Sequence, residues 1–131
     1  MRRPVVADDF DDDLGCVSTC AMLLVSGDNI DAEEFTKLFQ LTPTEIAKAG
    51  TCSGWRISSA GKLESKSAEQ HIDWILHQLE GKREIIENLK GRGCQVDLYC
   101  QWQGREGSDL GPYLRSKLLK KVSDLNLNLI F

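Results

Sequence analysis

Residues 94–103 alternate between apolar and polar or amphipathic side chains, and this pattern constrains the fold more than any other part of the sequence. Successive side chains of a strand point to opposite faces, so the segment predicts a strand with one buried face and one face in water. Strands of this kind belong to antiparallel sheets that are covered on one side. The side chains expected to face the core are Cys94, Val96, Leu98, Cys100 and Trp102.

The rest of the sequence predicts four more strands and three helices. Residues 16–25 have apolar side chains on both faces of a strand, which favours a central place in the sheet. The second helix is expected to run from Ser67 to Lys90, with Gly81 as the point where it can break. The other helices are expected to begin at Asp31 and Pro112, and the other strands at 42–48, 55–59 and 127–131.

This order, β-α-β-β-α-β-α-β, predicts an α+β fold. We expect a two-layer sandwich of ferredoxin-like type, in which the helices cover one face of a mostly antiparallel sheet. A chain of 131 residues has room for one domain. We expect that domain to span residues 16–131 and residues 1–15 to form a flexible acidic arm.

The charge of the chain is concentrated in this arm. The net charge is −4, and the arm holds Asp8, Asp9, Asp11, Asp12 and Asp13. The rest of the chain is close to neutral, which argues against a nucleic-acid partner, because proteins that bind nucleic acids normally present a strongly basic surface. We interpret the arm as solvated, and the alternative is a docking element for a basic partner.

The cysteines favour a reducing compartment. There are five, an odd number, and none forms a CxxC pair. Reduced thiols are therefore expected instead of a disulfide framework. No apolar run approaches the roughly 20 residues that span a membrane, and the N-terminus lacks the apolar stretch of a secretory signal. We expect a cytoplasmic protein that does not bind a membrane.

Several short segments resemble those of one family. They are GWRISS at 54–59, HIDWIL at 71–76 followed by LEGK at 79–82, and GCQVDLYC at 93–100, with LTPT at 41–44. Over about residues 20–131 the sequence resembles the bacterial family known as domain of unknown function 4279. The resemblance supports the α+β fold. The family has no established activity, so the resemblance implies no catalytic residue.

No cofactor or metal site is expected. His71 and His77 are six residues apart on one predicted helix, so they point to different sides and cannot share a metal ion. A calcium loop that starts at Asp9 lacks the glycine and glutamate required at its sixth and twelfth positions. The glycines of the chain match no phosphate-binding loop.

Catalysis is kept as an alternative to binding. Cys52 is the one cysteine expected in a loop, and Arg56 could favour its thiolate, but no base can be assigned to it. The basic residues of the last helix are interpreted as a solvated face and not as a phosphate track. They are Arg115, Lys117, Lys120 and Lys121.

The uncovered face of the sheet is the candidate site. A cation, a carboxylate, a phenol and several amides on one face can direct hydrogen bonds at one ligand. We therefore expect a non-catalytic module that binds a protein partner or a small ligand, most concretely an immunity-type protein that neutralises a toxin. The alternatives are a small enzyme that uses Cys52 or carboxylates of this face, and a nucleic-acid or regulatory module. The residues expected on the face are Arg56, Asp97, Tyr99, Gln101, Asn126 and Asn128.

Overall fold

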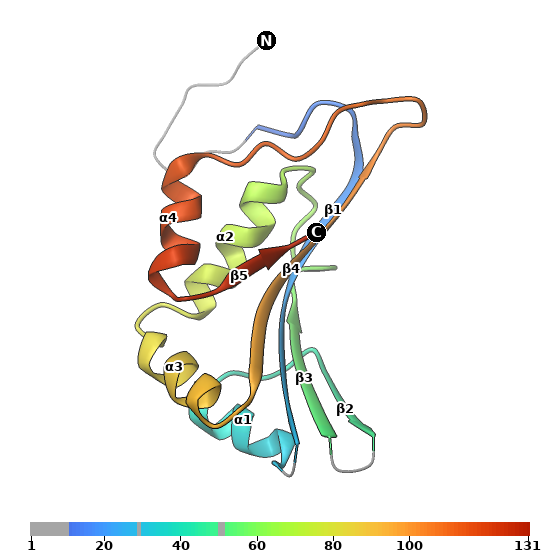
Figure 1. Cartoon of the computed structure of the whole chain (residues 1–131). Coiled ribbons are helices and arrows are strands. Elements are labelled where there is room, and N and C mark those ends of the chain that lie inside the picture. Colours follow the sequence, from blue (N-terminus) through green and yellow to red (C-terminus); the bar gives the residue numbers. More distant parts are fainter. Residues whose placement is uncertain (1–10, 29, 50–51) are drawn as a thin grey trace.

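The polypeptide forms one five-stranded sheet and four helices, seen in a computed structural model that describes residues 11–28, 30–49 and 52–131 (Figure 1). The strands are β1 (Cys16–Asp28), β2 (Glu45–Ala49), β3 (Cys52–Ser58), β4 (Gln95–Gly104) and β5 (Asn128–Ile130). The helices are α1 (Ala32–Phe39), α2 (Ala68–Gln78), α3 (Arg83–Gly91) and α4 (Ser116–Asp124).

The sheet has the strand order β2-β3-β1-β4-β5. β1 lies in the middle and pairs antiparallel with β3 and β4, so the central place expected for residues 16–25 is confirmed. β2 pairs antiparallel with β3, and β5 pairs parallel with β4. The sheet is therefore mostly antiparallel, with one parallel edge.

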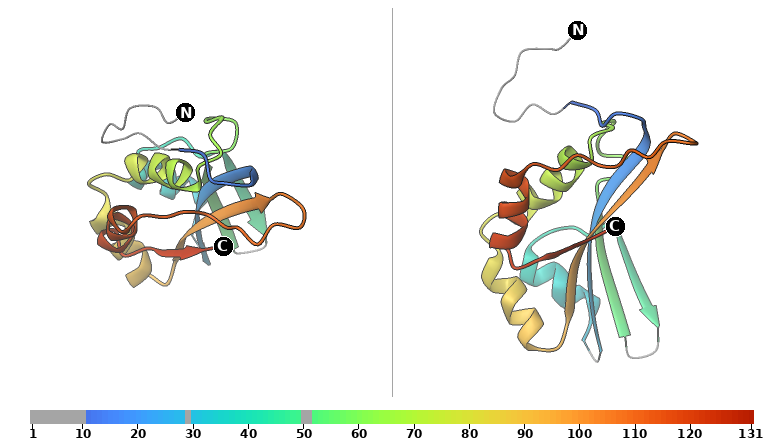
Figure 2. Two further views of the ribbon diagram at one scale, coloured as in Figure 1. Left: turned by 90° about the horizontal axis from the view of Figure 1, so that it is seen from above. Right: turned by 45° about the horizontal axis from the view of Figure 1, so that its top comes forward.

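All four helices lie on one side of the sheet (Figures 1 and 2). The core fills the space between these layers, where Leu23 of β1 and Leu98 of β4 are fully buried register partners. Trp55 of β3 stacks on Phe39 of α1 with 5.2 Å between the ring centroids, and its indole N–H donates a hydrogen bond to Thr36 Oγ1. The two-layer α+β architecture is confirmed, as is the inward set of β4.

The helix expected from Ser67 to Lys90 is divided in two. The Ser67 hydroxyl caps α2 by accepting a hydrogen bond from the Gln70 N–H. Between α2 and α3, Gly81 adopts a φ of 76°, which a helix interior does not allow. In the described part of the chain, no helix is both long and apolar enough to cross a membrane.

Several boundaries differ from those expected. β3 begins at Cys52, so the backbone of this residue belongs to a strand and not to a loop. β2 begins at Glu45, after Pro43, because proline has no N–H to donate to a ladder. α4 begins at Ser116, four residues after the expected Pro112.

Ordered contacts begin within the expected arm. Asp13 is buried, and its Oδ2 accepts hydrogen bonds from the Ala68 N–H at 3.0 Å and the Trp102 indole at 2.9 Å. Asp12 Oδ1 accepts one from the Lys66 N–H. For Asp13 the expectation of a solvated, flexible arm is wrong, because its carboxylate joins the start of α2 to β4. Residues 1–10 lie outside the described part of the chain.

Candidate functional site

The sheet face away from the helices, called here the open face, is organised in rows. Register partners on neighbouring strands share a face, so the strand pairing defines which side chains stand side by side. One row crosses all five strands, because Leu24 of β1 is the partner of Arg56 on β3 and of Asp97 on β4. In order across the sheet, this central row is Glu45, Arg56, Leu24, Asp97 and Asn128.

A second row lies beside the central row. Met22 of β1 is the partner of Ser58 on β3 and Tyr99 on β4, and Tyr99 is the partner of Ile130 on β5. Gln101 follows in the next row, opposite Cys20. The structure thus brings together five of the six expected site residues, namely Arg56, Asp97, Tyr99, Gln101 and Asn128.

Asn126 is not placed with this group. It lies in the turn between α4 and β5, with a φ of 57°, and its carbonyl accepts a hydrogen bond from the Lys90 ammonium of α3. The alternation expected from Asn126 onward begins only at Asn128, the first residue of β5. Asparagine adopts the left-handed backbone conformation more readily than most residues, which explains why this turn position holds Asn126.

The charges of the open face are distributed unequally. Arg56 forms an ion pair with Glu45 across β2 and β3, a partner that sequence reasoning missed. The Asp97 side chain is half-buried and forms no hydrogen bond or ion pair with any residue that the structure describes. Leu24 and Met22 of β1 are half-buried and lie between the strands that carry these two positions. Tyr99 of β4 and Ile130 of β5, also half-buried, continue the row of Met22 beyond β1.

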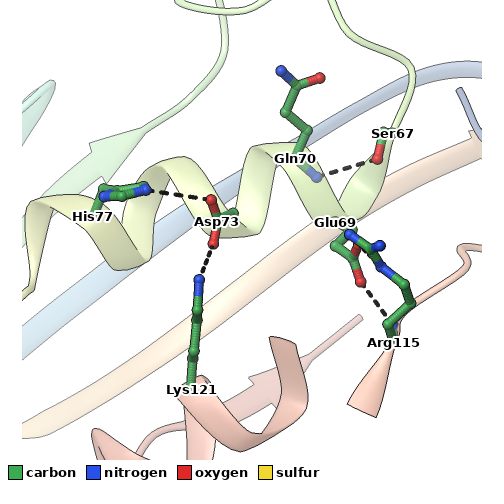
Figure 3. Close-up of polar contacts among 7 residues, drawn as sticks. All are labelled: Ser67, Glu69, Gln70, Asp73, His77, Arg115 and Lys121. Carbon is green, nitrogen blue, oxygen red and sulfur yellow. Dashed lines mark hydrogen bonds and ion pairs between the residues drawn. The ribbon is translucent and has the colours of Figure 1, made fainter. Parts of the chain in front are cut away.

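The helix layer behind the sheet contains a separate polar cluster (Figure 3). Glu69 and Asp73 are buried carboxylates one turn apart on α2, both directed at the segment that carries α4. The backbone N–H and the guanidinium of Arg115 donate to Glu69 at 2.7 and 2.6 Å. The Lys121 ammonium donates to Asp73 Oδ1 at 3.0 Å, and His77 Nε2 lies 3.5 Å from Asp73 Oδ2.

These ion pairs correct the interpretation of the last helix. Arg115 and Lys121 do not belong to a purely solvated basic face, because each neutralises a buried carboxylate of α2. Lys120 pairs with Asp124 on the exposed side of α4. The cluster attaches α4 to α2 through two of the four basic residues of this segment.

A groove of about 240 Å³ lies beside this cluster, lined by Asp73, His77 and Lys121 and by the apolar Leu76 and Leu125. It is smaller than the roughly 300–1,000 Å³ of typical ligand pockets, and its Asp73 is already paired. The described residues contain no group of three or more His, Cys, Asp or Glu side chains that could hold a metal ion.

Comparison with known proteins gives one match. The family model described as Domain of unknown function (DUF4279) matches residues 17–131, from the second residue of β1 to the last residue of the chain. The chain belongs to this family. No curated protein and no solved structure matches it. The DUF4279 match includes the open face and the helix layer described above.

The thiols of this DUF4279 domain differ in exposure. Cys16, Cys94 and Cys100 are buried and Cys20 is half-buried, and all four are free. Burial raises the pKa of each of these thiols, so their environments do not activate them as nucleophiles. The side chain of Cys52 lies outside the described residues, and its catalytic role stays an untested alternative.

Proposed function

We propose that this DUF4279 domain is a non-catalytic binding module that docks a protein partner on its open face. The observation that supports the proposal most is the row from Glu45 to Asn128. In this row Leu24 separates the Arg56–Glu45 ion pair from the Asp97 carboxylate, which has no side-chain partner among the described residues. Protein interfaces combine such apolar centres with a polar rim. The half-buried Tyr99 is of the residue type that most often anchors them.

The charge of the chain supports a basic partner. The net charge is −4, and the acidic residues near the N-terminus account for much of it. Opposite charge on a partner accelerates association and adds specificity. An immunity-type protein that neutralises a basic toxin, in the cytoplasm where thiols stay reduced, is the most concrete form of this proposal.

The finer fold assignment is part of the same proposal. The order β2-β3-β1-β4, all antiparallel, is the arrangement that relates the first four strands to ferredoxin-like sheets. The α4–β5 unit would then be an addition at the β4 edge.

The test compares two matched double variants by photo-cross-linking and capture in cells that natively make the protein. Arg56→Ala with Tyr99→Ala removes two side chains of the open face. Arg105→Ala with Tyr113→Ala removes the same two residue types from the exposed connection between β4 and α4. We expect the first variant to lose the captured partner and the second to retain it. Equal capture by both folded variants would contradict the proposal.

A further inference from the structure

The central row of the open face has complementary residues at equal distances on the two sides of β1. Arg56 and Asp97 lie one strand away from Leu24 on opposite sides, because both are its register partners. Glu45 and Asn128 lie two strands away on opposite sides. The row therefore has an apolar residue at its centre and opposite charges on the two strands next to β1. Its two ends carry a carboxylate, on β2, and an amide, on β5.

A twofold axis parallel to β1 matches this row to itself. Packed sheets are usually ~10 Å apart, so this axis runs about 5 Å above the sheet. It brings a second copy face to face with the first. It places β3 of one copy over β4 of the other, and β2 over β5. Arg56 then meets the second copy's Asp97, Glu45 meets its Asn128, and the two Leu24 side chains meet on the axis.

We propose that the open face binds a second copy of this chain in this orientation. The proposal rests on the proposed function, because it names a second occupant of the same face. A second copy carries the same net charge of −4, so the Arg56–Asp97 contacts select it and not the net charge that favours a basic partner. The charge pattern selects the orientation. An axis in the same plane but perpendicular to β1 would place β3 over β3, with Arg56 against Arg56 and Asp97 against Asp97.

The pairing supplies what the isolated chain lacks. The Asp97 carboxylate has no side-chain partner among the described residues, and in the pair it gains the guanidinium of the second copy's Arg56. Arg56 keeps Glu45 as a neighbour within its own chain, and a guanidinium has enough N–H donors for both carboxylates. Met22, in the adjacent row, packs near the Met22 of the second copy and continues the apolar centre.

The available area predicts a weak dimer. Five strands at ~4.8 Å spacing and seven residues of β1 at ~3.3 Å give a projected area of roughly 440 Å² per copy. Standard stable interfaces bury about 800 Å² per partner, so this contact belongs to the transient class. We expect monomers at about 1 µM protein and substantial dimer at roughly 100 µM or above.

Sedimentation velocity of the full chain over this concentration range tests the proposal through charge reversal. Arg56→Asp alone and Asp97→Arg alone each place like charges against one another, so each variant is expected to remain monomeric. An equimolar mixture of the two restores both pairs and is expected to dimerise, as is the chain that carries both substitutions. Arg83→Asp is the matched control, because Arg83 is also an exposed arginine beside a glutamate, but on α3.

Leu24→Lys provides a variant that leaves the Arg56–Glu45 ion pair intact. It places two lysines together on the twofold axis, and we expect it to abolish the dimer while circular dichroism shows a folded chain. A wild-type chain that stays monomeric at the highest concentration overturns the dimer. Association unaffected by Asp97→Arg and Leu24→Lys overturns it too. In either case the proposed function stands if the Arg56 and Tyr99 variant still loses its partner.

Discussion

The hydroxyl oxygen of Ser59 lies 2.6 Å from Nδ1 of His71 in the interior of the domain, where neither side chain is more than 1% exposed. His71 Nε2 lies 2.7 Å from the Ser65 carbonyl, which can only accept, so Nε2 carries the proton and Nδ1 accepts from Ser59. Ser59 Oγ in turn accepts from the Ala21 N–H of β1. The pair connects β1 to α2 through hydrogen bonds between buried groups.

Ser59→Ala is expected to destabilise the domain by about 2–3 kcal/mol, because it leaves the Ala21 N–H and His71 Nδ1 buried without partners. Urea unfolding followed by circular dichroism measures the change. Ser18→Ala is the control, since the Ser18 hydroxyl is exposed and donates a long 3.4 Å bond to Gln103. A loss below about 0.5 kcal/mol for Ser59→Ala would show that the network adds nothing to stability.

Asp13→Ala is expected to lower the free energy of unfolding by about 2 kcal/mol. The substitution removes the acceptor of both the Ala68 N–H and the Trp102 indole. Asp12→Ala removes one exposed hydrogen bond to the Lys66 N–H and should cost about 0.5 kcal/mol or less. If both substitutions have the same small effect in urea unfolding, the segment before β1 contributes no ordered contact to the domain.

Arg115→Ala is expected to cost about 2 kcal/mol, because the buried Glu69 carboxylate loses its guanidinium and keeps, among the described residues, the backbone N–H of residue 115. Lys120→Ala breaks an exposed ion pair of the same helix segment and should cost about 0.5 kcal/mol or less. A double-mutant cycle with Glu69→Gln measures the coupling between Glu69 and Arg115. A coupling energy near zero would mean that the two side chains do not interact in solution.

The sequence predicts the inward and outward sides of the strands well, because side-chain parity is a local property. The alternation of β4 and the apolar faces of β1 both reappear in the structure. Register is not local. The pairing of Glu45 with Arg56 depends on which residue of β2 lies opposite β3, and a one-residue slip would separate them.

Contacts between distant segments account for the remaining differences. Asp13 is read as solvated within an acidic tract, yet its partners lie 55 and 89 residues further along the chain. Glu69 and Arg115 are 46 residues apart, so the sequence pattern of either helix alone shows only charged positions. Asn126 extends the polar-apolar alternation of the last strand, but its left-handed φ places it in a turn instead.

The thiols of Cys20 and Cys100 test which strand side chains point to the open face of the sheet and which point to the helices. Cys100 is 3% exposed on the inward face of β4, and burial raises its pKa to about 11, whereas Cys20 is half-buried on the open face of β1. Only the thiolate reacts, so at pH 8 we expect a thiol reagent to label Cys20 well before Cys100, with mass spectrometry identifying the sites. Urea should abolish the difference.

The raised pKa of Cys100 also predicts a pH dependence of stability. The folded state holds the thiol proton more tightly than the unfolded state, whose pKa is near the ordinary 9.0. The folded state is therefore not penalised below about pH 9, and stability is lost as the pH rises from 9 towards 11. Cys100→Ala should remove this part of the alkaline loss in urea unfolding, and Cys20→Ala should remove less of it, because Cys20 is less buried. Rapid labelling of Cys100 in the folded chain, together with an unchanged alkaline loss in Cys100→Ala, would mean that this side of β4 does not face the helices.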